Sequence, residues 1–386
     1  MKVVYLVHDL GDAAVRRRVR MLQIGGAEVA LAGFRRGESA PEAVEGVTPV
    51  DLGRTHDARM VQRALSVGRS WADLGRRADL FRGADVIMAR NLEMLLLATG
   101  ARDRFAPDAA VIYEALDIHR LMLSDGAPGK LLRAAERRLA QACDLLVVSS
   151  PAFLTHYFEA RGQAAGLPSL LIENKPLDDP DRTPPAARIV EPAAGQPWRI
   201  GWFGAIRCPK SLAILGELAR RLDGAVEVVI RGRPTPALFG DFEGLVARAP
   251  HVRFEGPYRN PEDLAAIYGE VHFTWAIDFY EEGQNSSWLL PNRLYEGGLF
   301  GSVPLALGSV ETGRKLERMG VGVRFGEPLI DQMERFFRDL TQARYAQLRA
   351  EAARPPLETW LARPDECRAV VASLAGLRPQ AVRSAA

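Results

Sequence analysis

The strongest constraint on the fold of this chain is a repeated alternation of short β-rich runs with longer helical patterns. The first series of β-rich runs covers residues 3–7, 27–32, 86–88, 110–113 and 145–148, with a helical pattern over 13–25. Such alternation predicts βαβ units in which the strands form a parallel sheet. The chain has 386 residues, which exceeds the size at which one hydrophobic core usually keeps growing. We therefore expect an α/β protein with two domains.

A proline-rich stretch separates this series from a second one. Six prolines lie at positions 176, 180, 184, 185, 192 and 197, which suits a semi-rigid linker. The second series has β-rich runs at 198–203, 226–230, 251–254, 271–276 and 303–306, and helical patterns at 212–222, 261–268, 291–300, 329–341 and 343–353. We predict a first domain over 1–178, a linker over 179–197, a second domain over 198–356, a helix over 357–376 that crosses back to the first domain, and a disordered tail over 377–386.

Composition excludes several classes of protein. Hydrophobic residues make up 47% of the chain, but no apolar run approaches the roughly 20 residues of a membrane-spanning helix. The first strand follows Met1-Lys2 directly and leaves no room for a signal peptide, so a cytoplasmic location is expected. The formal net charge of +2 argues against nucleic acid as a partner. Cys143, Cys208 and Cys367 lack metal-ligand spacing, so we expect no metal site.

In parallel sheets of this kind, ligands bind beyond the carboxyl ends of the strands, and two such domains that face each other enclose a cleft. In the second domain, the strand at 198–203 runs into Gly204, Arg207 and Lys210, and then into a helix. Two cations beside a glycine turn and a helix N-terminus predict a diphosphate site. A solvated loop with unpaired basic side chains is the alternative interpretation.

A second polar loop, at 281–290, ends at a proline that favours the first turn of a helix. The loop contributes Glu282, Asn285 and Ser286, and the helix contributes Asn292, Arg293 and Glu296. Arg293 and Glu296 are three residues apart and so lie on neighbouring faces, where one meets a phosphate and the other a ribose. The alternative is a surface ion pair between them, which would not explain the loop.

These motifs resemble the donor domain of family 4-type GT-B glycosyltransferases, which have two Rossmann-like domains facing a central cleft. The resemblance rests on Gly204 with Lys210, the turn at Gly232, the run Leu-Pro-Asn-Arg-Leu-Tyr-Glu-Gly at 290–297 and the run Gly-Ser-Val-Pro-Leu-Ala at 301–306. It implies that Lys210 and Arg293 contact the diphosphate of a nucleotide-sugar, that Glu296 contacts the ribose, and that backbone near Gly232 and Arg233 contacts the base.

Two positions depart from the family pattern. The arginine that usually follows the loop glycine is Ala205 here, with Arg207 as its substitute. The earlier of two glutamates that usually lie eight residues apart is replaced by Trp288, and Glu282 takes its place only across an insertion.

In the first domain, carboxylates and imidazoles follow the predicted strands at 3–7 and 110–113. Transfer to a hydroxyl needs a base, and the spacing of Tyr113 and Asp117 resembles bacterial exopolysaccharide transferases of the xanthan and succinoglycan types. Asp117 is therefore the expected base, with Glu114 and Asp9 as further candidates, and His119 is expected to orient the acceptor or the carboxylate. A helix cap at Asp117 and ordinary packing of His8 and His119 are the alternatives.

The acceptor side is expected to include His8, Asn91 and Glu93, which also follow predicted strands. Residues 54–82 hold seven arginines against three aspartates, with Met60, Val67, Trp71 and Leu74 at helical spacing. Such a segment lies either on an anionic membrane surface, where a lipid-linked acceptor is found, or with its apolar face against the core.

Together these features predict a glycosyltransferase that moves a hexose from a UDP-type donor to a saccharide or polyprenyl-diphosphate-linked acceptor in exopolysaccharide assembly. The nucleotide-sugar is a co-substrate, and neither a cofactor nor a metal is expected because Arg207, Lys210 and Arg293 offset the diphosphate charge. The family 4 resemblance implies retention of the anomeric configuration, whereas a base at Asp117 favours inversion. Two alternatives remain open: a nucleotide-sugar 2-epimerase of the same fold, and an inert scaffold or binding protein.

Overall fold

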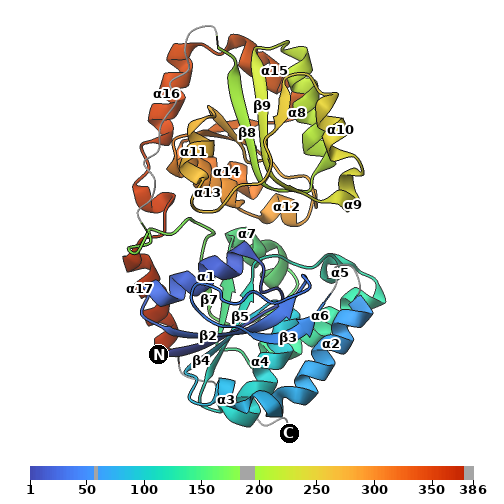
Figure 1. The fold of residues 1–386 in the computed structure, drawn as a ribbon, viewed down its shortest axis with the longest axis vertical. Helices are drawn as coiled ribbons and strands as arrows, with labels where there is room; N and C mark the ends of the chain where they lie inside the picture. Colours follow the sequence, from blue (N-terminus) through green and yellow to red (C-terminus); the bar gives the residue numbers. More distant parts are fainter. Residues whose placement is uncertain (56–59, 183–195, 378–386) are drawn as a thin grey trace. The chain divides into compact units, whose positions relative to one another are not determined.

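A computed structural model describes residues 1–55, 60–182 and 196–377. The chain divides into two compact units. The first comprises Met1–Glu173 together with the chain from Arg363 onward, and the second comprises Asn174–Ala362. Each unit is built on its own parallel sheet, and Figure 1 shows both sheets with their flanking helices.

The first unit has a seven-stranded sheet among its described residues, in the order β3-β2-β1-β4-β5-β6-β7. The strands are β1 Lys2–Val7, β2 Glu28–Arg35, β3 Val50–Arg54, β4 Val86–Arg90, β5 Ala110–Ala115, β6 Leu145–Val148 and β7 Ser169–Leu171. The helices are α1 Ala13–Ile24, α2 Met60–Ala72, η1 Asp73–Arg77, α3 Ala78–Phe81, α4 Leu92–Phe105, α5 Arg120–Leu123, α6 Ala127–Ala140, α7 Pro151–Phe153, the π-helix η2 Leu154–Glu159 and α17 Pro364–Ala375.

The second unit has a six-stranded sheet in the order β10-β9-β8-β11-β12-β13. Its strands are β8 Trp198–Ile206, β9 Val226–Pro234, β10 Val252–Phe254, β11 Phe273–Trp275, β12 Val303–Leu307 and β13 Val323–Phe325. Its helices are α8 Pro209–Arg221, α9 Pro236–Phe239, α10 Phe242–Ala247, α11 Leu264–Gly269, α12 Asn285–Trp288, α13 Asn292–Leu299, α14 Glu311–Met319, α15 Leu329–Asp339, α16 Gln342–Ala352 and η3 Leu357–Thr359.

Both sheets have the doubly wound order in which the direction of strand addition reverses beside the first strand. That reversal lies between β1 and β4 in the first unit and between β8 and β11 in the second. Loops at a reversal diverge to opposite faces of the sheet and leave a crevice at the carboxyl ends of the strands, where ligands of such folds bind. Candidate site residues in each unit are therefore expected after these two pairs of strands.

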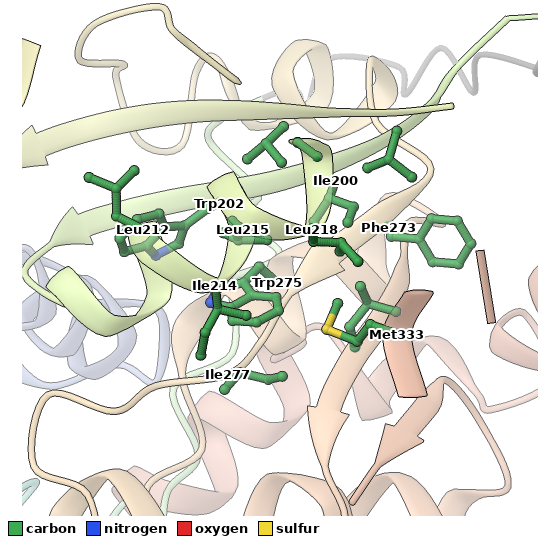
Figure 2. Packing of buried hydrophobic residues seen from close by; sticks show 14 of the residues in the cluster. Ile200, Trp202, Leu212, Ile214, Leu215, Leu218, Phe273, Trp275, Ile277 and Met333 are labelled. Atoms are coloured by element: carbon green, nitrogen blue, oxygen red, sulfur yellow. The ribbon is translucent and has the colours of Figure 1, made fainter. Parts of the chain in front are cut away.

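Apolar side chains from alternate positions of the strands hold the helices against the second sheet. Figure 2 shows Trp202 and Trp275, from neighbouring β8 and β11, packed with Leu215 and Leu218 of α8. All four are nearly or completely buried. Burial of one such side chain stabilises the fold by about 2 kcal/mol. The cluster therefore holds β8, β11 and α8 together.

The boundaries of the units differ from the predicted ones. The second unit begins at Asn174, before the predicted linker, and the chain rejoins the first unit at Arg363 rather than at 357. Residues just before Arg363 belong to the second unit because Trp360, 3% exposed, packs against Gly298, and Ala362 N donates to Pro176 O at 2.8 Å. The predicted tail lies almost entirely outside the described residues, as does most of the predicted linker.

Candidate active site

The first candidate element is the loop between β8 and α8. Strand β8 continues to Ile206, three residues beyond its predicted end, so Gly204 lies within the strand with a φ of +112°. Cys208 caps α8, because its Sγ accepts a hydrogen bond from Ser211 N at 3.3 Å. Arg207 and Lys210 therefore flank the start of a 13-residue helix, as the sequence predicted.

Both cations lie over aromatic rings of the loop that follows β11. The Arg207 guanidinium carbon is 4.8 Å from the centre of the Tyr280 ring, and Lys210 Nζ is 4.4 Å from the centre of the Phe279 ring. Lys210 Nζ also donates to both carboxylate oxygens of Glu282, at 2.8 and 2.7 Å. Glu282 was predicted to contact the donor, and Lys210 was predicted to contact its diphosphate. In this structure the two side chains bind each other.

Asp278 is a site residue that the sequence analysis missed. Its Oδ1 accepts from Ser286 Oγ at 2.7 Å and from Tyr280 N at 2.8 Å, and its Oδ2 lies 3.5 Å from Arg293 Nη2. Burial raises the pKa of Asp278, but the positive charges of Arg293 and Arg207 outweigh burial and hold that pKa below its ordinary value. An ionised carboxylate therefore lies close to two of the candidate phosphate-binding arginines.

The loop that contains Asn285 and Ser286 is closed by its own hydrogen bonds. Glu281 N donates to Ser286 Oγ at 2.8 Å, Asn285 Nδ2 donates to the Glu281 carboxylate, and Gly283 N donates to Ser287 Oγ at 3.1 Å. Asn285 and Ser286 are buried, and these hydrogen bonds tie both side chains to their own loop. Their predicted contact with a donor stays a prediction.

Helix α13 begins at Asn292 with Pro291 as its N-cap, close to the predicted start. Arg293 and Glu296 are both buried, at 8% and 3% exposed, so the alternative of a surface pair between them is wrong. Arg293 Nη2 donates to Ile277 O at 2.8 Å, which places its guanidinium beneath the loop that follows β11. Direct contact of Arg293 with diphosphate stays a prediction, and its side chain also supports Asp278 and the loop.

Gly232 and Arg233 lie at the carboxyl end of β9, opposite Gly204 and Ala205 of β8. Gly232 N donates to Gly256 O at 2.9 Å. Arg233 is exposed just before the strand ends. The strand end is thus shaped by glycine on both β8 and β9.

In the first unit, the residues predicted for the acceptor meet at the reversal between β1 and β4. The amide Nδ2 of Asn91 lies 3.4 Å from Nδ1 of His8. Asn91 has a φ of +70°, a costly conformation for a residue other than glycine, which is common at functional sites. Burial and the Arg90 guanidinium lower the pKa of His8, while the carboxylates of Glu93 and Asp117 act on it in the opposite direction.

Asp117 follows β5 by two residues and is exposed, as a base that meets an acceptor must be. His119 caps α5, because its Nδ1 accepts from Leu121 N at 3.2 Å. Its predicted orienting role stays a prediction. Asp9 accepts from Gly11 N at 3.0 Å and lies 3.3 Å from Arg36 Nε, which makes it a turn residue with an ionic partner.

Glu114 is wrong as a candidate base. The carboxylate is completely buried, and it accepts from Tyr5 OH and from Arg18 Nε, the latter at 2.7 Å, with Arg90 Nε 3.2 Å away. Burial raises the pKa of Glu114, but Arg18 and Arg90 outweigh it and hold that pKa below its ordinary value. Glu114 is part of a buried ionic cluster and is not exposed at the strand end.

The basic segment at 54–82 buries some of its described apolar side chains, but Leu65 is 57% exposed. Val67 and Leu74 are buried, and Trp71, 38% exposed, lies under the Arg104 guanidinium at 4.0 Å. These contacts favour the interpretation of a core-facing helix with a basic outer face. Arg59 and Asp57 lie outside the described residues, and Arg76 and Arg82 are largely exposed.

Within residues 1–55, 60–182 and 196–377, no group of three or more His, Cys, Asp or Glu side chains is arranged to hold a metal ion. No helix among those residues is both long and apolar enough to span a membrane.

Comparison with known proteins gives a full-length relative. The chain is 47% identical over 383 residues to "Succinoglycan biosynthesis protein ExoL" of Rhizobium meliloti (strain 1021), which covers 99% of this chain and 95% of that protein. A scan against protein-family models finds no match.

Solved structures with the same fold include two glycosyltransferases of lipopolysaccharide biosynthesis. Anabaena Alr3699/HepE in complex with UDP and glucose superposes with a TM-score of 0.69 at 14% identity, over 98% of this chain and 100% of that one. The lipopolysaccharide outer core galactosyltransferase WaaB superposes with a TM-score of 0.63 at 13% identity, over 97% of this chain and 99% of that one. WaaG, a glycosyltransferase involved in lipopolysaccharide biosynthesis, superposes with a TM-score of 0.55 at 15% identity, over 97% of each chain. The predicted GT-B fold class is therefore confirmed.

Proposed function

The chain belongs to the family of the succinoglycan biosynthesis protein ExoL, and we propose on that basis that it is a GT-B glycosyltransferase of exopolysaccharide biosynthesis. The observation that carries the proposal is the full-length relationship at 47% identity. The paired loops after β8 and β11 agree with it, since they gather cations where folds of this order bind nucleotides.

The donor in this proposal is a UDP-sugar. HepE, which shares the fold, has been solved with UDP and with UDP-glucose. In this chain Lys210 and Arg207 stand at the N-terminus of α8, where the helix dipole and the free N–H groups add to their attraction for a diphosphate. The negative charge of Asp278 attracts Arg207 and would restrain its guanidinium at the mouth of the site.

The reaction in this proposal is a direct displacement. The acceptor hydroxyl gives its proton to the Asp117 carboxylate, its oxygen forms a bond to the anomeric carbon, and the bond from that carbon to the diphosphate oxygen breaks. UDP leaves with the electron pair, and Lys210 and Arg207 stabilise the charge that develops on it. This sequence inverts the anomeric carbon and uses no bound metal.

The acceptor is proposed to be a saccharide or a polyprenyl-diphosphate-linked saccharide held by His8, Asn91 and Glu93. A cytoplasmic protein at the inner face of the membrane would meet such a lipid-linked acceptor. The exposed arginines of 54–82 would then attract anionic lipid by charge, and Leu65, 57% exposed, would add apolar contact. Co-sedimentation with anionic vesicles that disappears at high salt tests this step.

The two alternatives predict different products. A nucleotide-sugar 2-epimerase would convert the donor without an acceptor, and a scaffold would bind partners without turnover. The family relationship to a succinoglycan biosynthesis protein favours neither of them.

Calorimetric titration of the purified protein with UDP, GDP, ADP and their glucose conjugates tests the proposal. We expect UDP and a UDP-sugar to bind, and Lys210→Met to weaken both by about tenfold through loss of one charged contact. Binding that favours GDP or ADP would overturn the choice of donor, and the absence of any binding would overturn the donor site.

A further inference from the structure

The carboxylate of Glu296 is held on both sides by neutral donors. Its Oε2 accepts from Tyr268 OH at 2.9 Å, and its Oε1 accepts from Asn260 Nδ2 at 3.0 Å. Neither donor carries a charge, so the two bonds fix the plane of the carboxylate without cancelling its negative charge. The family resemblance implies a ribose contact for Glu296, but neither hydrogen-bond donor was predicted from the sequence.

Both donors are themselves fixed. Tyr268 of α11 is 1% exposed, packs edge-on against Phe203 of β8 with ring centres 4.9 Å apart, and stacks on Phe300 with ring centres 6.1 Å apart. Burial and the nearby Glu296 charge raise the pKa of Tyr268 well above its ordinary value, so its hydroxyl stays a donor. Asn260 follows Arg259, whose backbone N and guanidinium both bind the Asp263 carboxylate at 2.8 Å.

The segment that carries Asn260 also lies close to the end of β8. A Cβ placed on Gly204 would be 4.0 Å from the hydroxyl oxygen of Tyr258, two residues before Asn260. The segment that holds Asn260 therefore lies near the strand end that precedes Arg207.

A carboxylate oxygen has two lone-pair directions, and an ionised carboxylate accepts about four hydrogen bonds. With one bond taken on each oxygen, one acceptor direction remains on each, side by side. That pair of acceptors matches two adjacent hydroxyl groups of a sugar ring. A cationic partner in place of Tyr268 or Asn260 would have weakened both acceptors.

We propose that Tyr268 and Asn260 are positioning residues that hold the Glu296 carboxylate to receive the two adjacent ribose hydroxyls of the donor nucleotide. The inference rests on the proposed function, because it needs a nucleotide in this site. Glu296 supplies the contact to the nucleotide, and the other two residues act through Glu296.

The test compares the binding of UDP with that of 2′,3′-dideoxy-UDP by calorimetry, using wild-type protein and the variants Tyr268→Phe, Asn260→Ala and Glu296→Gln. Each variant is expected to weaken UDP about fivefold to tenfold, as the loss of one well-oriented hydrogen bond does, and to leave dideoxy-UDP unchanged. Tyr268→Phe combined with Glu296→Gln is expected to weaken UDP no more than Glu296→Gln alone.

Tyr345→Phe is the matched control, because Tyr345 is also buried in the second unit and its hydroxyl donates to His272 O at 3.5 Å. Tyr345→Phe is expected to leave the affinities for UDP and for dideoxy-UDP unchanged. A structural role for Tyr268 and Asn260 would weaken both nucleotides equally, which would overturn the positioning role while the donor site stands. Wild-type protein that binds neither nucleotide would overturn the proposed function and this inference with it.

Discussion

Gly204 and Gly232 lie opposite each other in β8 and β9, so close that a Cβ on Gly232 would be 1.8 Å from the carbonyl oxygen of Gly204. Both residues have positive φ, +112° and +141°. The two strands thus approach each other at the edge where the nucleotide is proposed to bind, and the absence of a side chain at Gly232 is what permits it.

Gly232→Ala is expected to lower the free energy of unfolding by about 3 kcal/mol, because the new methyl group meets backbone in a conformation that disfavours it. Urea denaturation measures the change. Gly240→Ala is the control: its φ is +65°, but a Cβ there has no heavy atom within 4 Å. The control isolates the conformational cost, about 1 kcal/mol. Equal losses in the two variants would contradict the steric account.

Glu282→Gln is expected to raise the affinity for UDP about fivefold at low salt. In the wild type the Lys210 ammonium must break its ion pair with Glu282 before it binds phosphate, and the variant has no such ion pair. Calorimetry at two salt concentrations measures the gain, which should shrink as salt increases. The gain should vanish when Lys210→Met is also present. A loss of affinity in Glu282→Gln would instead support direct contact between Glu282 and the donor.

Glu136 is a buried carboxylate that accepts from Tyr113 OH at 2.7 Å and from Tyr157 OH at 2.6 Å. Burial raises its pKa from 4.5 to about 7, although both tyrosines lower it. A raised pKa means that the folded state favours the protonated form. The contribution of Glu136 to the free energy of unfolding is therefore fully present below pH 4.5 and is lost as the pH rises through 7. The total loss is about 3 kcal/mol.

Unfolding free energies at several pH values between 4.5 and 8 measure this contribution. The difference between wild type and Glu136→Gln should fall by about 3 kcal/mol over that interval, since glutamine does not titrate. Glu159→Gln, a change at an exposed carboxylate of the same unit, should show no such trend. A constant difference for Glu136→Gln would contradict the raised pKa.

Glu114→Gln is expected to destabilise the first unit by about 3 kcal/mol, because it leaves the buried Arg18 and Arg90 without their shared counter-charge. Thermal and urea unfolding measure the loss. Where the variant remains folded at low temperature, turnover per folded molecule should stay near that of wild type. A folded variant with normal stability and no turnover would restore Glu114 as a base.

The sequence predicted the class of fold well because alternation of β-rich and helical runs is a local signal. It also placed α13 and its motif within one or two residues. Strand lengths were less certain: β8 and β9 each continue past their glycines, because those glycines pair with each other rather than beginning a loop. Short strands such as β3, β7 and β13 have too few apolar residues to stand out.

Contacts between distant segments could not be predicted from local patterns. Glu114 looks like a strand-end carboxylate until Arg18, 96 positions earlier, is seen to bind it. Tyr268 and Asn260 reach Glu296 from 28 and 36 positions away. Asp278 did carry a usable signal, because it follows a predicted strand in the same way as Asp9 and Asp117 do.

The most direct test of the account measures transfer of labelled hexose from a panel of UDP-hexoses to a lipid extract that contains polyprenyl-diphosphate saccharides. We expect label in the lipid fraction with the wild type and with the control variant Asp108→Asn. Asp108 is an exposed aspartate near the other end of β5. Asp117→Asn should reduce transfer by about a hundredfold or more while UDP affinity stays unchanged. Transfer by Asp117→Asn at the wild-type rate, or no transfer from any donor, would contradict it.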